Sequence, residues 1–138
     1  MRLAGKRVIA LVEDDYEDLE LWYPVLRLRE EGAEVVVAGL GAEVYHGKYG
    51  LPAEPDANVD DLDMRDFDAI LVVGGWVPAS AGVLKGRTMT CTPGIKDDVM
   101  NAGAHYVDEP VVVDGNLVTA RRPPDLPAYG AALVEALS

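Results

Sequence analysis

Cysteine and basic charge are both scarce in this sequence, and their scarcity excludes several classes of protein. The chain has 138 residues and one cysteine, Cys91, so no disulfide can form within it. Twelve Lys and Arg residues stand against 24 Asp and Glu residues, which gives a formal net charge of −12. Nucleic-acid binding needs a basic surface that neutralises phosphates. We therefore expect no nucleic-acid partner.

Long apolar runs are also missing. No run approaches the roughly 20 apolar residues that cross a bilayer, and the stretch Met1–Arg7 lacks the apolar core of a signal peptide. We expect a cytoplasmic protein with no membrane partner. The length fits one domain over residues 1–138, and a hydrophobic content of 49% predicts that this domain is globular.

Motifs for metals and cofactors are weak. The two histidines, His46 and His105, and the lone cysteine do not have the spacing of a zinc site. Gly74-Gly75 is not a dinucleotide-binding fingerprint by itself. The acidic turn at 13–18 offers oxygen ligands of the kind that Mg²⁺ or Ca²⁺ takes, but it lacks the glycine register of a calcium loop. We interpret it as a solvated turn and expect neither a metal nor a cofactor.

Alternating strands and helices are what the sequence does contain. Short aliphatic runs at 8–12, 34–38 and 67–73 are typical of parallel strands buried on both faces. An amphipathic helix follows the acidic turn and stops before Gly32, a short helix is predicted at 94–101, and a last helix runs from 126 or 127 to 137. We also predict a strand at 87–91 and an acidic connection with helix-start character at 56–66. Small hairpins are expected around 46–50 and 114–116, the latter with a type I′ turn at Asp114-Gly115.

Several stretches carry a family resemblance. Residues 11–24, 27–35, 47–50 and 67–75 closely resemble the ThiJ/PfpI superfamily, in particular its intracellular protease (PfpI-like) subgroup. Residues 80–87, 93–98, 101–104, 114–116 and 121–125 resemble it as well. The resemblance covers nearly the whole chain in the right order. It implies an α/β fold, a flavodoxin-like parallel-sheet sandwich with a small β-hairpin.

One segment departs from the family pattern. The family carries a cysteine nucleophile, followed by a histidine, on a tight strand-to-helix turn. Here residues 76–81 stand where the resemblance calls for a loop, a helix, a central strand and that nucleophile. We therefore predict an internal deletion near 77–80, natural or engineered, and a fold truncated by the loss of a central strand and a helix.

Two family positions are still present. Glu17 matches the acidic residue that approaches the cysteine sulfur, and Gly75 matches the glycine whose backbone N–H contributes to the oxyanion hole, where donors face developing negative charge. Each also has a purely structural interpretation. Glu17 suits a helix start, where the macrodipole favours a carboxylate, and Gly75 suits the turn that ends a strand. Asp18 and Glu20 are interpreted as neighbours without a role.

Cys91 is the candidate for a replacement nucleophile, with His105 as its base. A reactive thiol needs a depressed pKa from a nearby base or a helix N-terminus, and the helix predicted from residue 94 supplies such a terminus. The alternative is that Cys91 is a small buried apolar residue and His105 an ordinary surface histidine.

Two functions follow as hypotheses. The first is a weak intracellular hydrolase of PfpI-like type that acts on an ester, a peptide or a small carbonyl compound, with Cys91, Glu17 and His105 as catalytic candidates and Gly75 in the oxyanion hole. The second is a catalytically inactive, oligomerising remnant of the family. Because the predicted deletion leaves apolar sheet surface and strand edges uncovered, we expect a homodimer or higher homo-oligomer, with exchanged elements as one possible form.

Overall fold

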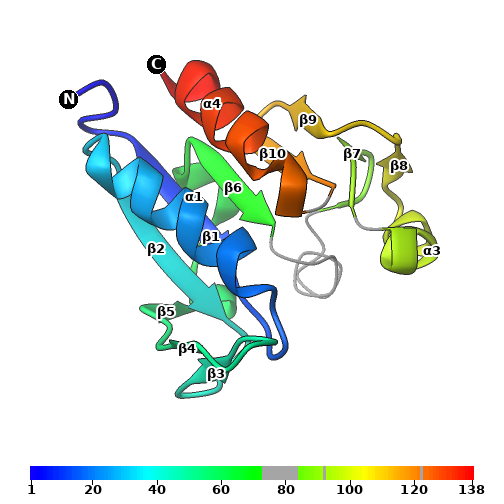
Figure 1. Cartoon of the computed structure of the whole chain (residues 1–138), viewed down its shortest axis with the longest axis horizontal. Coiled ribbons are helices and arrows are strands. Elements are labelled where there is room, and N and C mark those ends of the chain that lie inside the picture. Colours follow the sequence, from blue (N-terminus) through cyan, green and yellow to red (C-terminus); the bar gives the residue numbers. More distant parts are fainter. Residues whose placement is uncertain (73–83, 92, 122) are drawn as a thin grey trace.

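A twisted, mostly parallel sheet forms the centre of the protein. The computed structural model describes residues 1–72, 84–91, 93–121 and 123–138 (Figure 1). Within these residues the main sheet has the strand order β5-β2-β1-β6-β10-β9, and only β9 is antiparallel to its neighbour. The strands are β1 (Arg7–Leu11), β2 (Glu34–Gly39), β5 (Ala57–Asn58), β6 (Ala69–Val72), β9 (Val111–Asp114) and β10 (Leu117–Ala120). The predicted α/β parallel-sheet core is confirmed.

Both faces of the centre of this sheet are buried, which explains why the central strands are mostly aliphatic. In β1, Val8 and Ala10 belong to the core on one face, whereas Ile9 and Leu11 belong to the core on the other. Helices α1 (Asp18–Glu30) and α4 (Leu126–Leu137) cover the first face, side by side (Figure 1). The second face packs against the segments around Phe67 and residues 84–99. Alternation along an extended chain sends successive side chains to opposite faces, so the central strands β1, β2, β6 and β10 each contribute to both cores.

Smaller elements surround the main sheet. A hairpin pairs β3 (Tyr45–His46) with β4 (Pro52–Ala53), as predicted for this segment. A second small sheet pairs β7 (Thr88–Met89) in parallel with β8 (His105–Tyr106), and η3 (Pro93–Ile95) and α3 (Lys96–Asn101) lie between them in the chain. Three further 3₁₀ turns are η1 (Val59–Asp61), η2 (Met64–Asp66) and η4 (Pro123–Asp125). Within the described residues, no helix is both long and apolar enough to cross a membrane.

Three predicted elements differ in extent. The strand predicted at 87–91 reaches only from Thr88 to Met89, the two residues that pair with β8. Beyond it, the Thr90 backbone N–H donates to the Thr119 hydroxyl at 2.9 Å. The connection at 56–66 forms β5 and two 3₁₀ turns, each capped by the side chain of Asn58 or Asp63. The strand predicted at 67–73 begins at Ala69, since Phe67 still closes η2, and residue 73 lies outside the described residues.

The hairpin between β9 and β10 is confirmed, but its predicted turn type is wrong. Asp114 pairs with Leu117, so the two loop residues are Gly115 and Asn116. Gly115 has a positive φ of 59° and Asn116 does not, which is the pattern of a type II′ turn with glycine at its first central position. Asp114 stays in the strand because its carboxylate accepts a hydrogen bond from the Thr88 backbone N–H at 2.6 Å.

Gly39 packs closely against Tyr45 of the β3–β4 hairpin. Its Cα lies against the buried ring of Tyr45, and a Cβ there would overlap the ring. The Tyr45 hydroxyl is fixed because it accepts hydrogen bonds from the backbone N–H groups of Leu40, at 2.7 Å, and Ala42, at 3.2 Å. Gly39→Ala is therefore expected to lower the free energy of unfolding by about 3 kcal/mol in urea denaturation. Gly94→Ala, where a Cβ meets open space, is the control, and an equal loss there would contradict the explanation.

Candidate functional site

Glu17 stands at the junction of β1 and α1, after the carboxyl end of β1. Open α/β sheets bind ligands at this end of their strands. Glu17 is the N-cap of α1, and its Oε1 accepts a hydrogen bond from the Leu19 backbone N–H at 3.3 Å. Its Oε2 is buried and has no hydrogen-bond partner among the described residues. A buried polar atom without a partner is costly, so this oxygen marks a place suited to a water or a ligand.

Glu20 lies one turn further along α1, on the same side as Glu17. The pKa of the Glu20 carboxyl is raised to about 7, mostly by burial and then by the negative charge of Glu17, while the positive charge of Lys48 acts in the opposite direction. A carboxyl with this pKa can gain and lose a proton near neutral pH, as general acid–base catalysis requires. The two carboxyl groups thus form an acidic pair beside Lys48.

Asp18 fixes the loop that carries Lys48. Its side chain is buried, 7% exposed, and its two oxygens accept hydrogen bonds from the backbone N–H groups of Tyr49 and Leu51, both at 3.0 Å. Gly47 leaves the space for this contact, because a Cβ on it would overlap the Asp18 carboxylate. Asp18 therefore positions the β3–β4 hairpin against the start of α1.

The acidic turn before α1 also contacts this hairpin. His46 donates its backbone N–H to Asp14 Oδ1 at 3.0 Å, and its carbonyl accepts from the Asp15 N–H at 2.9 Å. The Lys48 N–H donates to the Tyr16 carbonyl at 2.7 Å. The sequence predicted a solvated turn. The structure adds that hydrogen bonds to the hairpin hold this turn in place. Within the described residues, no group of three or more His, Cys, Asp or Glu residues is placed to hold a metal ion.

Cys91 lies in the core on the other face of the sheet. It is 4% exposed and packs in the cluster that contains Ile9, Leu11 and Met89, whereas α1, which Glu17 caps, covers the opposite face. Burial raises the pKa of the Cys91 thiol to about 11, so the thiol is protonated at neutral pH. A nucleophilic cysteine needs a shift in the opposite direction.

His105 is exposed, in β8. Its backbone N–H donates to the Arg87 carbonyl at 2.7 Å, and its strand partner is Thr88. At about 3.3 Å per extended residue, Cys91 lies up to about 10 Å along the chain from that partner. Among the described residues, no hydrogen bond joins Cys91 to Glu17 or His105. The structure thus does not bring these three predicted residues into one hydrogen-bonded group, and Gly75 lies outside the described residues.

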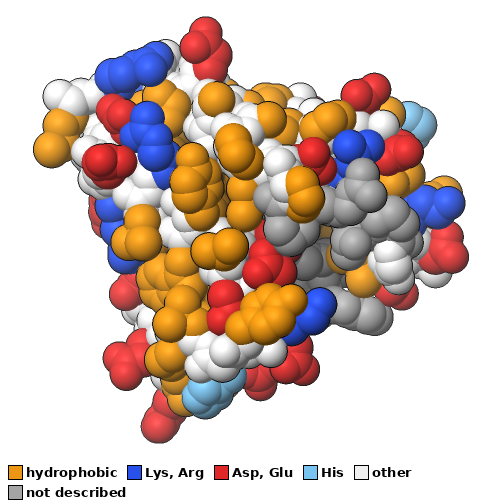
Figure 2. Space-filling view, viewed as in Figure 1, with side chains coloured by type: hydrophobic (Ala, Val, Ile, Leu, Met, Phe, Trp, Pro, Cys, Tyr) orange, Lys and Arg blue, Asp and Glu red, His pale blue; other side chains and the backbone are white. Residues whose placement is uncertain are grey.

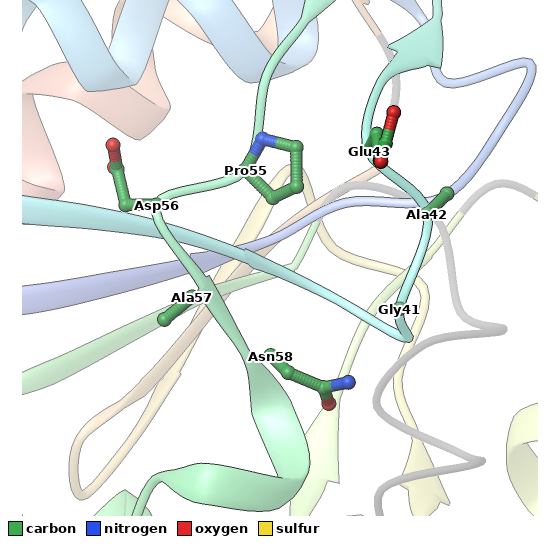
Figure 3. Close-up of a pocket in the computed structure, with 7 residues that line it drawn as sticks. All are labelled: Gly41, Ala42, Glu43, Pro55, Asp56, Ala57 and Asn58. Carbon is green, nitrogen blue, oxygen red and sulfur yellow. The ribbon is translucent and has the colours of Figure 1, made fainter.

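A separate pocket of about 310 Å³ opens at the carboxyl end of β2. Figure 3 shows Glu43 and Asp56 on opposite sides of it, with Asn58 on the strand that follows Asp56. Two of its polar side chains already stabilise the fold, since Asp56 accepts a hydrogen bond from the Val37 N–H and Asn58 accepts one from the Asp60 N–H. None of the predicted catalytic residues lines this pocket, so the site around Glu17 is the better candidate.

Comparison with known proteins settles the family. Residues 6–79 and 76–136 match the model of the DJ-1/PfpI family. The chain belongs to the DJ-1/PfpI family. The resemblance to the ThiJ/PfpI superfamily that the sequence carries is therefore confirmed.

Two relatives of this DJ-1/PfpI protein are named as deglycases. A "Deglycase" from Pyrococcus abyssi is 38% identical over 164 residues, with 95% of this chain and 99% of the relative covered. "Deglycase PfpI" from Pyrococcus furiosus is 35% identical over 164 residues, with the same coverage.

Two solved structures confirm the fold. A two-domain protein from Anabaena variabilis, with DJ-1/ThiJ/PfpI-like and ferritin-like domains, has a TM-score of 0.79 and 32% identity, over 96% of this chain and 48% of that one. Drosophila melanogaster DJ-1beta has a TM-score of 0.74 and 25% identity, over 96% of this chain and 90% of its own.

Sequence reasoning missed two residues of this DJ-1/PfpI site. Asp18 and Glu20 were interpreted as neighbours without a role, yet Asp18 holds the hairpin loop and Glu20 titrates near neutral pH. The spacing of three between Glu17 and Glu20 is a signal that could have found the pair, because such residues share a helix face. No local signal connects Asp18 to Tyr49 and Leu51.

Proposed function

We propose that this DJ-1/PfpI protein is a weak hydrolase of the deglycase type, with Glu17 as its acid–base residue and a small carbonyl compound, an ester or a peptide as its substrate. The observation that carries the proposal is the buried, unpartnered Oε2 of Glu17 beside the titrating carboxyl of Glu20. The names of the two Pyrococcus relatives support a deglycase class.

The proposed reaction on an ester or a peptide is the addition of water to the carbonyl carbon, with loss of the alcohol or amine. On hydrated methylglyoxal no group leaves, and Glu17 would instead move the proton of the hydrated carbon to the neighbouring carbonyl carbon, which gives lactate. On the ester or peptide, Glu17 takes a proton from the attacking water as the carbon–oxygen bond forms, and it returns the proton to the oxygen or nitrogen that leaves as its bond to carbon breaks. Glu20 can replenish or accept this proton, because its pKa of about 7 keeps both of its forms populated near neutral pH. One water is consumed in each cycle, and no cofactor is required.

Cys91 and His105 have a smaller part in this proposal than the sequence predicted. A thiol with a pKa of about 11 supplies little thiolate at neutral pH. We therefore assign the hydrolysis to Glu17. We expect Cys91 to be a packing residue of the core with no part in the reaction. The oxyanion donor at Gly75 stays a prediction from the family resemblance.

The internal deletion near residues 77–80 is part of the proposal. Two observations support it: the two family matches meet and overlap at residues 76–79, and the aligned region of each Pyrococcus relative, at 164 residues, is longer than this whole chain. The sheet offers a way to close over a lost strand, because β6 pairs directly with β10 through Ile70–Leu117 and Leu71–Val118. We propose that residues 1–138 form one domain. We also propose a cytoplasmic location, which suits a chain whose single cysteine cannot form an internal disulfide.

Glu17→Gln tests the acid–base role. We expect kcat/KM for an activated ester, and for methylglyoxal consumption, to fall about 100-fold or more, because a positioned acid or base contributes roughly 10² to 10⁴ in rate. Cys91→Ala and His105→Ala are expected to keep most of the activity. Glu17→Asp, which retains a capping carboxylate, controls for the stability of α1 in urea denaturation.

The outcomes separate the two hypotheses. Equal activity in the wild type and Glu17→Gln would remove Glu17 from the mechanism, and loss of activity in Cys91→Ala would return the nucleophile to Cys91. A wild type without turnover above buffer would favour the second function, the catalytically inactive member of the family. That alternative is supported by the buried, high-pKa thiol and by the predicted loss of the nucleophile segment.

A further inference from the structure

The hairpin loop, residues 47–51 between β3 and β4, has a partner for every one of its backbone N–H groups. Those of Tyr49 and Leu51 donate to the buried Asp18 carboxylate, both at 3.0 Å. That of Lys48 donates to a carbonyl of the acidic turn at 2.7 Å, and the other two donate to carbonyls of the loop itself, both at 2.9 Å. Part of the backbone of an exposed loop normally bonds to water. This loop is instead a fixed support for the side chains that it carries.

The hairpin loop presents one cation, Lys48, next to the acidic pair of Glu17 and Glu20. Lys48 is exposed, and its charge acts on the Glu20 carboxyl. Its ammonium nitrogen lies 5.9 Å from the centre of the Tyr49 ring, and no ion pair joins it to a carboxylate among the described residues. Five arginines, by contrast, already pair with carboxylates: Arg7, Arg27, Arg29, Arg65 and Arg121. The Lys48 ammonium therefore keeps its hydrogen-bond donors available to an anionic group.

Apolar side chains lie beside this cation. Tyr49 and Leu51 of the hairpin loop are 75% and 47% exposed, and Leu19 at the start of α1 is 61% exposed. Figure 2 shows hydrophobic, acidic and basic side chains next to one another over the region where the hairpin meets the start of α1 in Figure 1. This region thus offers a cation and an apolar surface together, beside the carboxyl groups that the proposed reaction uses.

The charge of the whole protein makes a fixed cation at this place informative. A net charge of −12 repels anions over most of the surface, and the acidic pair repels them whenever it is ionised. A neutral substrate needs no cation here. A substrate with a carboxylate does, because an ammonium offsets that repulsion and donates charge-assisted hydrogen bonds.

We propose that Lys48 binds a carboxylate group of the substrate while Tyr49 and Leu51 contact its apolar part. This inference rests on the proposed function and deepens it, because it narrows the substrate to an ester, a peptide or a carbonyl compound that carries a carboxylate. Lys48 is then a specificity-determining residue. It holds the substrate beside Glu17 and takes no part in bond making or breaking.

Two aryl acetates that differ in one group test the inference. The para-carboxyphenyl ester carries a carboxylate, and the para-carbamoylphenyl ester carries a neutral amide in its place. The ratio of their kcat/KM values cancels any difference in the amount of folded enzyme. We expect Lys48→Met to lower this ratio about 5- to 10-fold, through a higher KM for the carboxylate ester, since the ion pair it removes is exposed. Lys48→Arg keeps the charge and should keep most of the ratio.

Lys96→Met is the matched control for Lys48→Met. The Lys96 ammonium also lies 5.9 Å from the centre of a tyrosine ring, that of Tyr106, but on α3 and β8. Its loss should leave the ratio of the two esters at the wild-type value. An unchanged ratio in Lys48→Met would overturn the proposal, and so would an equal fall in Lys96→Met.

Binding of benzoate separates this inference from the proposed function, because it needs no turnover. In amide NMR spectra of the wild type, we expect benzoate to shift the signals of Tyr49 and Leu51, with a Kd that rises about 5- to 10-fold in Lys48→Met. Neutral benzamide should bind both proteins equally and more weakly than benzoate binds the wild type. Benzoate binding that depends on Lys48, in a protein that hydrolyses neither ester, would support this inference and contradict the proposed function. Absent shifts, or an equal Kd in Lys48→Met, would overturn the inference.

Discussion

Asp18→Ala is expected to lower the free energy of unfolding by about 3 kcal/mol, which is a large share of the stability of a domain of this size. The buried carboxylate of Asp18 accepts the backbone N–H groups of Tyr49 and Leu51. Hydrogen bonds to charged groups contribute about 1.5–3 kcal/mol each, and alanine would leave both donors without a partner. Urea denaturation at pH 7 measures the loss.

Asp14→Ala is the matched control for this prediction. Asp14 also accepts one backbone N–H of the hairpin, that of His46, but it is exposed. Water can replace an exposed acceptor, so the expected loss is below about 1 kcal/mol. Asp18→Asn keeps the volume and one acceptor oxygen, and it should recover part of the loss. If the two alanine variants lost equal stability, the burial of the Asp18 hydrogen bonds would not explain the effect of Asp18→Ala.

Glu20→Gln is expected to make the protein more stable above pH 7, by about 1–3 kcal/mol, and to have little effect at pH 4. Burial, followed by the charge of Glu17, raises the pKa of Glu20 from 4.5 to about 7. Between these pH values the folded state binds more protons than the unfolded state, so the stability of the wild type falls as the pH rises. Glutamine carries no charge and removes this loss. Partial exposure of Glu20 keeps the effect toward the lower end of the range.

Urea denaturation of both proteins from pH 4 to pH 8 measures this difference. Glu30→Gln is the control on the same helix, because Glu30 is 75% exposed in its contact with Arg27 and exposed pairs contribute little. A Glu20→Gln curve parallel to that of the wild type would show that Glu20 ionises in the folded state as it does in the unfolded chain. It would also remove the support that Glu20 gives to the proposed proton transfer.

Local patterns in the sequence predicted most of the fold. The aliphatic runs at 8–12 and 34–38 become β1 and β2, because a strand buried on both faces must be apolar at every position. Helices α1 and α4 follow from apolar spacing, and the Asp114–Asn116 segment follows from turn chemistry. The errors fall where a distant group competes with the local pattern. Strand β7 is limited to the two residues that pair with the short strand β8, and Thr88 holds Asp114 in its strand.

The candidate site could be predicted only in part. Glu17 is placed by its position before an amphipathic helix, and the family by motifs spread along the chain. The separation of Cys91 from Glu17 could not be predicted, because the face of the sheet on which a residue packs depends on how the strands and their connections assemble. The same holds for the burial that raises the pKa of Cys91 and of Glu20.

The sequence by itself determined the α/β class, the family and the place of Glu17 at a helix start, because these depend on periodicity, capping and motifs within short windows. The tertiary structure alone decided that Cys91 is a protonated core residue, that Asp18 clamps the hairpin and that Lys48 lies beside Glu20. Each of these depends on contacts between residues far apart in the chain. Desolvation and hydrogen-bond satisfaction are properties of that assembly, which no local pattern encodes.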